Sequence, residues 1–513
     1  MNWKKWIKYT AIALAILLIS SFVYMSRVGT RMYGGLTTKV DHTQFKPAEG
    51  KFAIRNVSIL SLDGDSLISN QTVLIENGLI IAIDSNLNIL PGTAEIDGMG
   101  KYLIPGLIDT HVHLFQSPND LLLYLANGVT EIQELIGEDS HLQWKREVED
   151  GRVGPKMHVA SPRLGSFEKL EGWFMSWSQG YMNIQDASQG REAVQRLHEQ
   201  GYDGIKIYSQ LNRESYMAIT ETAKSLDMRV MGHVPWELTL QDIWENGQSG
   251  IAHFEELMNA LSREFDSNSR RIGSFKGRED EFLQFIETRS DALAKDLIDN
   301  EVAVTSTLWL TKSFARQPFD LKAVLEEVEL EYENPGISEW VEFIPQGLGW
   351  LPSVNRYKLP ANQTEEGRAA SVKYWDTYAK ACELLAHYLS ERGVKIVTGT
   401  DANLPLAVPG FSLHDELGSL NDAGMSNAQV LLAATALPAQ WLGSNSGKIA
   451  VGYDANLVLL EKNPLEDISN TKVINTVIAK GKVYNRALLD QMLAAVKAAN
   501  DESRDVNIDA FIE

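Results

Sequence analysis

The middle of the chain, residues 102–440, alternates short apolar segments with longer segments of helical pattern. This alternation is typical of a parallel α/β architecture, because each parallel strand needs a crossover connection to reach the next one. Eight segments predict a closed α/β barrel of the (β/α)8 TIM type. The predicted strands are Leu107–His113, Gly128–Ile132, Lys156–Ala160, Gly204–Tyr208, Arg229–His233, Gly250–His253, Ala303–Thr307 and Lys395–Asp401.

Other segments interrupt and flank the predicted barrel. Residues 310–372 contain several prolines and are too long for one crossover helix, so we interpret them as an insertion near the barrel mouth. Two β-rich blocks, 51–101 and 447–487, enclose the barrel and carry turn signals such as Asn77-Gly78. They predict one small β-sandwich domain built from both chain ends. A helix and an acidic tail are expected over 488–513.

The first residues form a separate unit. Lys4, Lys5 and Lys8 precede a run from Tyr9 to Met25 that contains no charged residue. About seventeen such residues is the lower limit for a helix that spans a membrane. Residues 1–30 therefore predict an N-terminal transmembrane signal anchor, and a cleaved signal peptide is the alternative.

The charges around this run bear on its orientation. The lysines before it favour a cytoplasmic N-terminus, which would place the remaining chain outside the cytoplasm, in a periplasmic or extracellular space. Arg27, Arg31 and Lys39 lie on the other side of the run and weaken this argument. The expectation is a single-pass membrane protein.

Charge and cysteine content exclude several classes of protein. The chain has 47 Lys and Arg against 68 Asp and Glu, a formal net charge of −21. Such an acidic chain is a poor partner for nucleic acid, which binds clustered cations. Cys382 is the one cysteine, so neither a disulfide framework nor a cysteine-rich zinc site is available.

Four histidines end predicted barrel strands. His111 and His113 are two residues apart on the first strand, so both imidazoles point to the same face. His233 and His253 end two further strands, and barrel enzymes carry their chemistry at this end. A single histidine is as often structural, but four at one level predict metal ligands.

Asp401 ends the last predicted strand. An aspartate there could simply cap the next helix. In the functional interpretation its carboxylate binds a metal ion and accepts a proton from metal-activated water.

Lys206 and Tyr208 belong to the fourth predicted strand, where flanking isoleucines pack outward and both side chains point into the barrel. A buried ammonium beside metal ions is unfavourable. A neutral lysine could instead react with CO2 to give a carbamate that bridges two metals. The alternative is a surface lysine at a strand edge.

In this order, the six candidate ligands resemble those of the amidohydrolase superfamily. The resemblance extends from about residue 51 to 487. It includes Tyr102–His113, Ser412–Gly418, Ala433–Ala436 and Gly447–Leu460, where Asn456 replaces an aspartate that is usual in the family.

The resemblance implies a role for each position. His111, His113 and Asp401 would hold the more buried of two divalent metal ions, with zinc as the expected metal. His233 and His253 would hold the other, and carboxylated Lys206 would bridge them together with a hydroxide. Prolidase-like members have this lysine, whereas imidazolonepropionase-related members and deaminases typically use one metal. Tyr208 would contact a substrate carboxylate.

The expected activity is hydrolysis of an amide-type C–N bond in a small molecule, such as a dipeptide, an N-acyl amino acid or a cyclic amide. Hydrolysis of lactones or phosphotriesters is an alternative, since the same activated water attacks other electrophiles. A third interpretation is a membrane-tethered binding protein that has lost catalysis. The complete set of candidate ligand residues argues against this interpretation.

Overall fold

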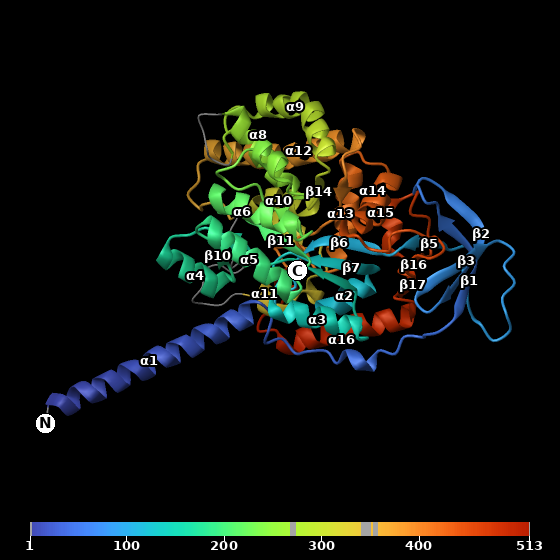
Figure 1. Cartoon of the computed structure of the whole chain (residues 1–513), viewed down its shortest axis with the longest axis horizontal. Coiled ribbons are helices and arrows are strands. Elements are labelled where there is room, and N and C mark those ends of the chain that lie inside the picture. The colour runs from blue at the N-terminus through green and yellow to red at the C-terminus, as the bar shows by residue number, and fades with distance from the viewer. Residues whose placement is uncertain (1–2, 267–272, 340–349, 352–357, 512–513) are drawn as a thin grey trace.

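The computed structural model describes residues 3–266, 273–339, 350–351 and 358–511. Parallel strands lie at its centre (Figure 1), and they form a ring. These strands are β6 (Leu107–Val112), β7 (Val129–Glu134), β8 (Lys156–Val159), β11 (Gly204–Ile207), β12 (Arg229–Gly232), β13 (Gly250–Ala252), β14 (Ala303–Thr305) and β15 (Ile396–Val397).

Hydrogen bonding joins these strands into a continuous ring. One set runs β6-β7-β8, and the other contains β11-β12-β13-β14-β15 in this order. Parallel bridges connect the two sets at both junctions, between Ala160 and Gly204 and between Val112 and Ala402. Each strand of the ring overlaps a segment predicted from the sequence, and the pairing agrees with the predicted barrel.

Helices surround the ring and cover its apolar outer face. They are α2 (Asp120–Ala126), α3 (Asp139–Glu149), α5 (Ala187–Gln200), α6 (Arg213–Ser225), α7 (Leu240–Asn246), α8 (Phe254–Phe265), α9 (Glu279–Asp299), α10 (Leu308–Leu325), α12 (Glu365–Glu391), α13 (Phe411–Asp422), α14 (Asn427–Ala434) and α15 (Ala436–Leu442). Between β8 and α5 the chain makes an excursion through β9 (Leu164–Gly165), α4 (Lys169–Gln179) and β10 (Met182–Asn183).

The predicted insertion, 310–372, lies partly outside the described residues. Its described part contains the end of α10, the 3-10 helix η2 (Leu330–Tyr332), the short helix α11 (Pro335–Ser338) and the start of α12. Trp350 and Leu351 are buried in one apolar cluster with Leu406 and Val408, which follow Asp401. This segment therefore packs against the loop beyond the last barrel strand.

Strands from both ends of the chain share one mixed sheet beside the barrel, called here the satellite sheet. Its order is β18-β17-β16-β5-β1-β2-β3, and β4 pairs with β1. The strands are β1 (Phe52–Leu60), β2 (Leu67–Glu76), β3 (Leu79–Asp84), β4 (Ala94–Asp97), β5 (Tyr102–Pro105), β16 (Leu457–Leu460), β17 (Ile474–Ala479) and β18 (Lys482–Asn485).

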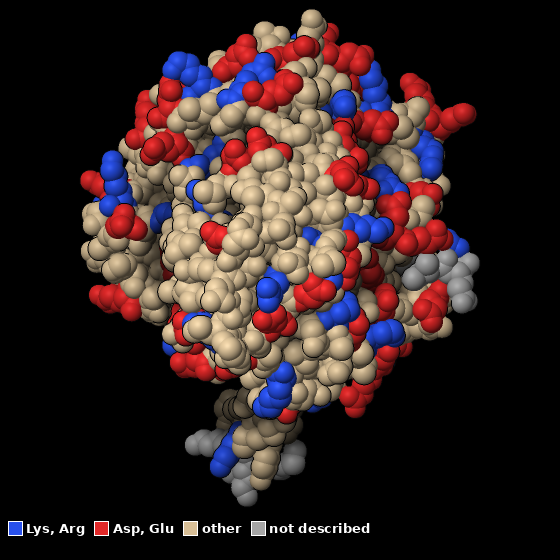
Figure 2. All heavy atoms as spheres, turned by 90° about the vertical axis from the view of Figure 1, so that its right-hand side faces the viewer, with Lys and Arg blue, Asp and Glu red and all other residues tan. Residues whose placement is uncertain are grey.

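Alternate side chains along β16 explain how the satellite sheet packs against the barrel. Leu457 and Leu459 join the apolar core of the satellite sheet, whereas Val458 and Leu460 belong to the core of the barrel. Successive side chains of a strand point to opposite faces, so one strand serves both cores. Figure 2 shows this side of the molecule, where acidic side chains gather towards the edges and the centre carries few charges.

The two ends of the chain outside the barrel are helical. The C-terminal helix α16 (Arg486–Ser503) packs on α2. The N-terminal helix α1 (Trp3–Met32) projects away from the body (Figure 1). Within it, Trp6–Met32 is long and apolar enough to cross a membrane, by length and composition. Near the end of α1, Val28 is buried.

Candidate metal centre

The six predicted ligands come together at the C-terminal ends of the barrel strands. β6 leads to His111 and His113, β11 carries Lys206, and the other three residues directly follow or lie just beyond β12, β13 and β15. All but one are buried, with exposed fractions of 0–6%, and the remaining residue, His233, is partly buried. The six residues are His111, His113, Lys206, His233, His253 and Asp401.

The carboxylate of Asp401 lies in the middle of the histidines. Its Oδ1 is 2.6 Å from Nε2 of His113 and 3.2 Å from Nε2 of His111. Its Oδ2 is 3.9 Å from Nε2 of His253. Ligand atoms of His111, His253 and Asp401 all lie within 4.8 Å of one another. This spacing is short enough for the three residues to share one cation.

Lys206 lies against this group, and its side chain is buried. Its Nζ is 3.5 Å from Nε2 of His111. Among the described residues, no carboxylate comes close enough to Lys206 to form an ion pair. Burial lowers the pKa of Lys206 to about 8, although Asp401 and Glu256 act in the opposite direction. A neutral, nucleophilic amine is therefore accessible near neutral pH.

His233 and His253 form the other side of the group. Their rings are 5.4 Å apart and meet edge to face. Nδ1 of His253 lies 2.8 Å from the hydroxyl of Thr307, and Nδ1 of His233 lies 2.7 Å from the hydroxyl of Ser209. Such outer hydrogen bonds hold each ring in place and leave Nε2 to face inward.

The backbone at two of these residues adopts the left-handed region. His253 has φ of 69° and Asp401 has φ of 57°. Residues with a side chain rarely adopt this conformation, which costs on the order of 1–3 kcal/mol and persists where the surrounding structure imposes it. The amide of Asp401 donates to the carbonyl of His111 at 2.8 Å, which fixes the turn after β15.

Three buried carboxylates support the ligands and were not predicted from the sequence. Glu134 Oε1 lies 3.6 Å from Nδ1 of His113. Glu256 Oε1 lies 3.1 Å from Nδ1 of His233. Asp109 accepts a hydrogen bond from the hydroxyl of Thr400 at 2.7 Å. Glu134 is the last residue of β7. Its position at a strand end could have identified it as a site residue from the sequence.

The electrostatics favour the metal-binding forms of His111, His253 and Asp401. At His113, burial lowers the pKa, but the charge of Asp401 outweighs burial and raises it. Burial, with Lys206 nearby, holds the pKa of His111 well below its usual range, and burial lowers that of His253 to about 3. Burial also acts to raise the pKa of Asp401, but the charges of His113 and His253 outweigh it and keep this pKa low. Neutral imidazoles beside a carboxylate are the protonation states that metal binding requires.

The donor set therefore fits divalent metal ions. Four imidazoles, one carboxylate and one amine converge from different strands, and Nδ1 of His111 is buried without a hydrogen-bond partner among the described residues. Nitrogen and oxygen donors of this kind suit zinc and related borderline metals.

Tyr208 lies beside the group, next to a cation. Its ring stacks on His233 with centroids 4.2 Å apart, and it meets Tyr181 edge to face. The guanidinium carbon of Arg163 lies 5.8 Å from the centre of the Tyr208 ring and 4.7 Å from that of Tyr181. Arg163 was not predicted as a site residue. Arg163 follows β8 at the same end of the barrel as the candidate ligands. Its place shortly after a predicted strand could have identified it as a site residue from the sequence.

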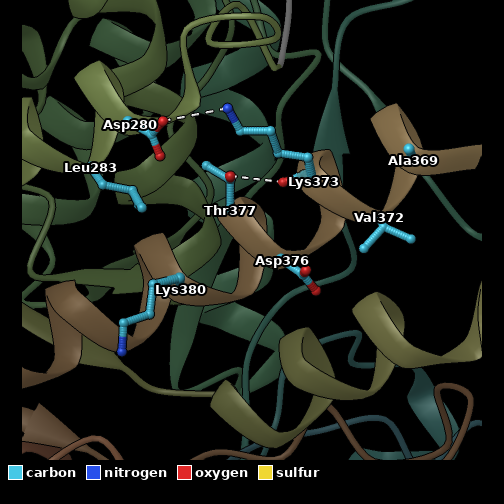
Figure 3. Close-up of a pocket in the computed structure, with 8 residues that line it drawn as sticks. All are labelled: Asp280, Leu283, Ala369, Val372, Lys373, Asp376, Thr377 and Lys380. Atoms are coloured by element: carbon cyan, nitrogen blue, oxygen red, sulfur yellow. Dashed lines mark hydrogen bonds and ion pairs between the residues drawn. The ribbon is translucent and has the colours of Figure 1, made fainter. Parts of the chain in front are cut away.

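A separate pocket on the outside of the barrel does not belong to this group. It has a volume of about 570 Å³ and lies between α9 and α12, where Lys373 pairs with Asp280 at 3.4 Å (Figure 3). None of its lining residues is one of the six ligands. They are Asp280, Leu283, Ala369, Val372, Lys373, Asp376, Thr377 and Lys380.

Comparisons with known proteins agree with this geometry. A model of the amidohydrolase family matches residues 353–484. A 5'-deoxyadenosine deaminase from Methanosphaera stadtmanae is 23% identical over 453 residues, which are 84% of this chain and 92% of that protein. The chain also matches dihydroorotases over short segments; for that of Trichlorobacter lovleyi the segment is 10% of the relative's length, at 52% identity.

Solved structures share the fold. A bottromycin amidohydrolase superposes with a TM-score of 0.66 at 19% identity, covering 92% of this chain and 96% of that one. A prolidase in complex with N-methylphosphonate-L-proline superposes with a TM-score of 0.59 at 18% identity, covering 85% and 99%. The family model, the deaminase relative and the shared fold together support assignment of the chain to the amidohydrolase superfamily. The family predicted from the sequence is confirmed, and the predicted enzyme class, a hydrolase of carbon–nitrogen bonds, agrees with it.

Proposed function

We propose that this protein is a metal-dependent hydrolase that cleaves an amide-type C–N bond in a small molecule carrying a carboxylate. The observation that carries the proposal is the position of Asp401, whose carboxylate lies 2.6 Å from an imidazole nitrogen of His113 and 3.2 Å from one of His111. The same His111 nitrogen lies 3.5 Å from the buried amine of Lys206. A buried cluster of this composition does not stabilise the fold by packing alone, because removing several polar groups from water costs free energy.

Two metal ions would be held by this cluster. His111, His113 and Asp401 would hold one, and His233 and His253 would hold the other. Burial lowers the pKa of Lys206 to about 8, which makes its neutral form more accessible. In that form Nζ would react with CO2 and lose one proton, and the resulting carbamate would join the residues that hold the ions. Divalent metal ions at such a site lower the pKa of bound water and polarise a carbonyl oxygen.

The chain's own groups would then handle protons and position. Asp401 would accept the proton of the attacking water and return it to the nitrogen of the leaving amine, so the carboxylate is regenerated in each turnover. Its low pKa keeps it ionised beforehand. Glu134 and Glu256 would hold His113 and His233 in orientation through their Nδ1 contacts.

The carboxylate preference is proposed from Tyr208 and Arg163. Phenol and guanidinium groups both donate hydrogen bonds to carboxylate oxygens. Stacking of Tyr208 on His233 places the phenol next to one metal ligand, and Arg163 lies over the same ring. A substrate whose carboxylate adjoins the scissile amide would reach both. Dipeptides and N-acyl amino acids have this arrangement, as the sequence already indicated.

The proposal is tested by substrate turnover. Purified protein loaded with zinc is assayed against dipeptides, N-acyl amino acids, lactones and phosphotriesters, with and without a chelator. We expect chelator-sensitive release of an amine from the first two classes. Preferred turnover of lactones or phosphotriesters would assign the alternative activity, and absence of turnover in all four classes would favour a binding protein.

A further inference from the structure

Helix α4 carries an apolar stripe that faces away from the protein. Leu170, Trp173, Phe174 and Trp177 follow the spacing i, i+3, i+4 and i+7, and their exposed fractions are 86%, 68%, 51% and 39%. In a surface helix this stripe normally packs on the core. Here Gly172 is the only buried residue of the helix. An exposed apolar patch of this kind marks an interaction surface.

The patch lies beside the point where α1 leaves the body. Tyr33, the residue after α1, donates its hydroxyl to the carbonyl of Ser178 near the end of α4 at 3.2 Å. Figure 1 shows α4 at the margin of the body on the side from which α1 projects. A bilayer entered by α1 would therefore begin close to the aromatic face of α4.

Two aromatic contacts connect the residue after α1 to the candidate metal centre. The ring of Tyr33 is 5.1 Å from that of Phe115, which in turn is 5.8 Å from the ring of His113. The amide of Gln116 donates to the carbonyl of Tyr33 at 2.9 Å. In the loop after β12, Trp236 is 54% exposed. The end of the anchor is thus tied to the loop that follows two predicted ligands.

We propose that α4 lies in the interface of the same bilayer that α1 enters, with its aromatic stripe among the lipid headgroups. Tryptophan favours this interface because its ring is apolar and its N–H is polar. Together, α1 and α4 would give the body two contacts with the membrane and hold the mouth of the metal centre towards the lipid surface. The contact is independent of the reaction proposed above.

The charge of the chain indicates which lipid surface fits. A formal net charge of −21 does not favour anionic headgroups. Within α4, Lys169 and Glu171 offset each other. Binding would therefore depend on burial of apolar and aromatic area rather than on Coulomb attraction. We expect the contact to form on zwitterionic phosphatidylcholine and to be insensitive to salt.

The experiment uses the full-length chain in phosphatidylcholine vesicles. An environment-sensitive fluorophore is attached at Leu170→Cys or, in a second variant, at Trp173→Cys; the native Cys382 is buried and does not compete for label. The matched control is Met99→Cys, since Met99 is 67% exposed and lies next to the satellite sheet. Vesicles are prepared with and without a nitroxide-labelled lipid that quenches fluorophores in the interface.

We expect the lipid-borne nitroxide to remove most of the emission at positions 170 and 173 and to leave position 99 unchanged, at low and high salt. Emission at 170 and 173 that is as unquenched as at 99 would overturn the proposal. A fluorophore at 170 or 173 that is shielded from water but not quenched by the lipid nitroxide would indicate that a protein partner covers the stripe. This result would also overturn the proposal. A requirement for anionic lipid, or failure of the chain to remain with the vesicles, would have the same consequence.

Discussion

His113 and Asp401 lie with Nε2 and Oδ1 2.6 Å apart, although they follow the first and last strands of the barrel, β6 and β15. The contact exists because β15 continues into a bridge between Ala402 and Val112 of β6, which closes the ring. Closure of the ring therefore brings the proposed proton acceptor next to the first predicted metal ligands.

The first prediction concerns metal content. Six donor residues in one buried group predict about two zinc ions per chain after reconstitution. His233→Ala should lower the content to about one, because one of two nitrogen ligands of that ion is lost, whereas His387→Ala on the outer helix α12 should retain both. Elemental analysis of the folded protein measures this. One ion in the unaltered chain would favour the mononuclear branch of the superfamily.

The second prediction concerns Asp401. Asp401→Asn keeps the size of the side chain but removes the proton acceptor, so kcat should fall about 10²–10⁴-fold. At least one metal ion should remain bound. Asp376→Asn, on the outer surface of α12, serves as the control and should keep full kcat. An Asp401→Asn enzyme with nearly unchanged kcat would remove Asp401 from the proposed role.

The third prediction concerns Lys206. Lys206→Ala should lose the bridging group and with it metal content and turnover. Added short-chain carboxylate, such as acetate, should restore part of both, because the space left by the side chain can admit a free carboxylate. Lys224→Ala at the surface of α6 should behave as the unaltered chain. If acetate restores nothing while the variant remains folded by circular dichroism, the carbamate proposal loses its support.

The fourth prediction concerns Tyr208. Tyr208→Phe removes a hydroxyl and should cost about 1.5–3 kcal/mol of preference for an acid over its amide or methyl ester. The measurement is kcat/KM for the three substrates. Tyr388→Phe on α12 should leave the preference unchanged. A constant acid-to-ester ratio in Tyr208→Phe would leave Arg163 as the candidate for carboxylate recognition.

The fifth prediction concerns α1. Full-length protein should fractionate with membranes, because Trp6–Met32 can span them. Deletion of residues 1–25 should leave only weak, reversible membrane binding and a stable body. Deletion of residues 1–33 should also lower the thermal midpoint, since it removes Tyr33 and the ion pair between Arg31 and Asp505. Equal thermal midpoints for both truncations would contradict the packing of this segment.

Local patterns in the sequence were sufficient to place the strands and to name the residues that gather in the candidate metal centre. Apolar segments separated by helical stretches predicted the strands of the ring, because strand and helix periodicities are properties of neighbouring residues. These residues could be named because polar side chains such as His111 and Lys206 stand at or near strand ends, where a barrel places them together.

Only the tertiary structure decided which groups contact one another. The pairing of Glu256 with His233, and of Arg163 with Tyr208, depends on distances across the barrel mouth that no local pattern specifies. The spacing of Leu170 and Trp173 in α4 would by itself predict a buried face, yet the fold leaves it exposed. Burial depends on what the rest of the chain places over a helix, so sequence periodicity identifies an apolar face and the three-dimensional arrangement determines what it meets.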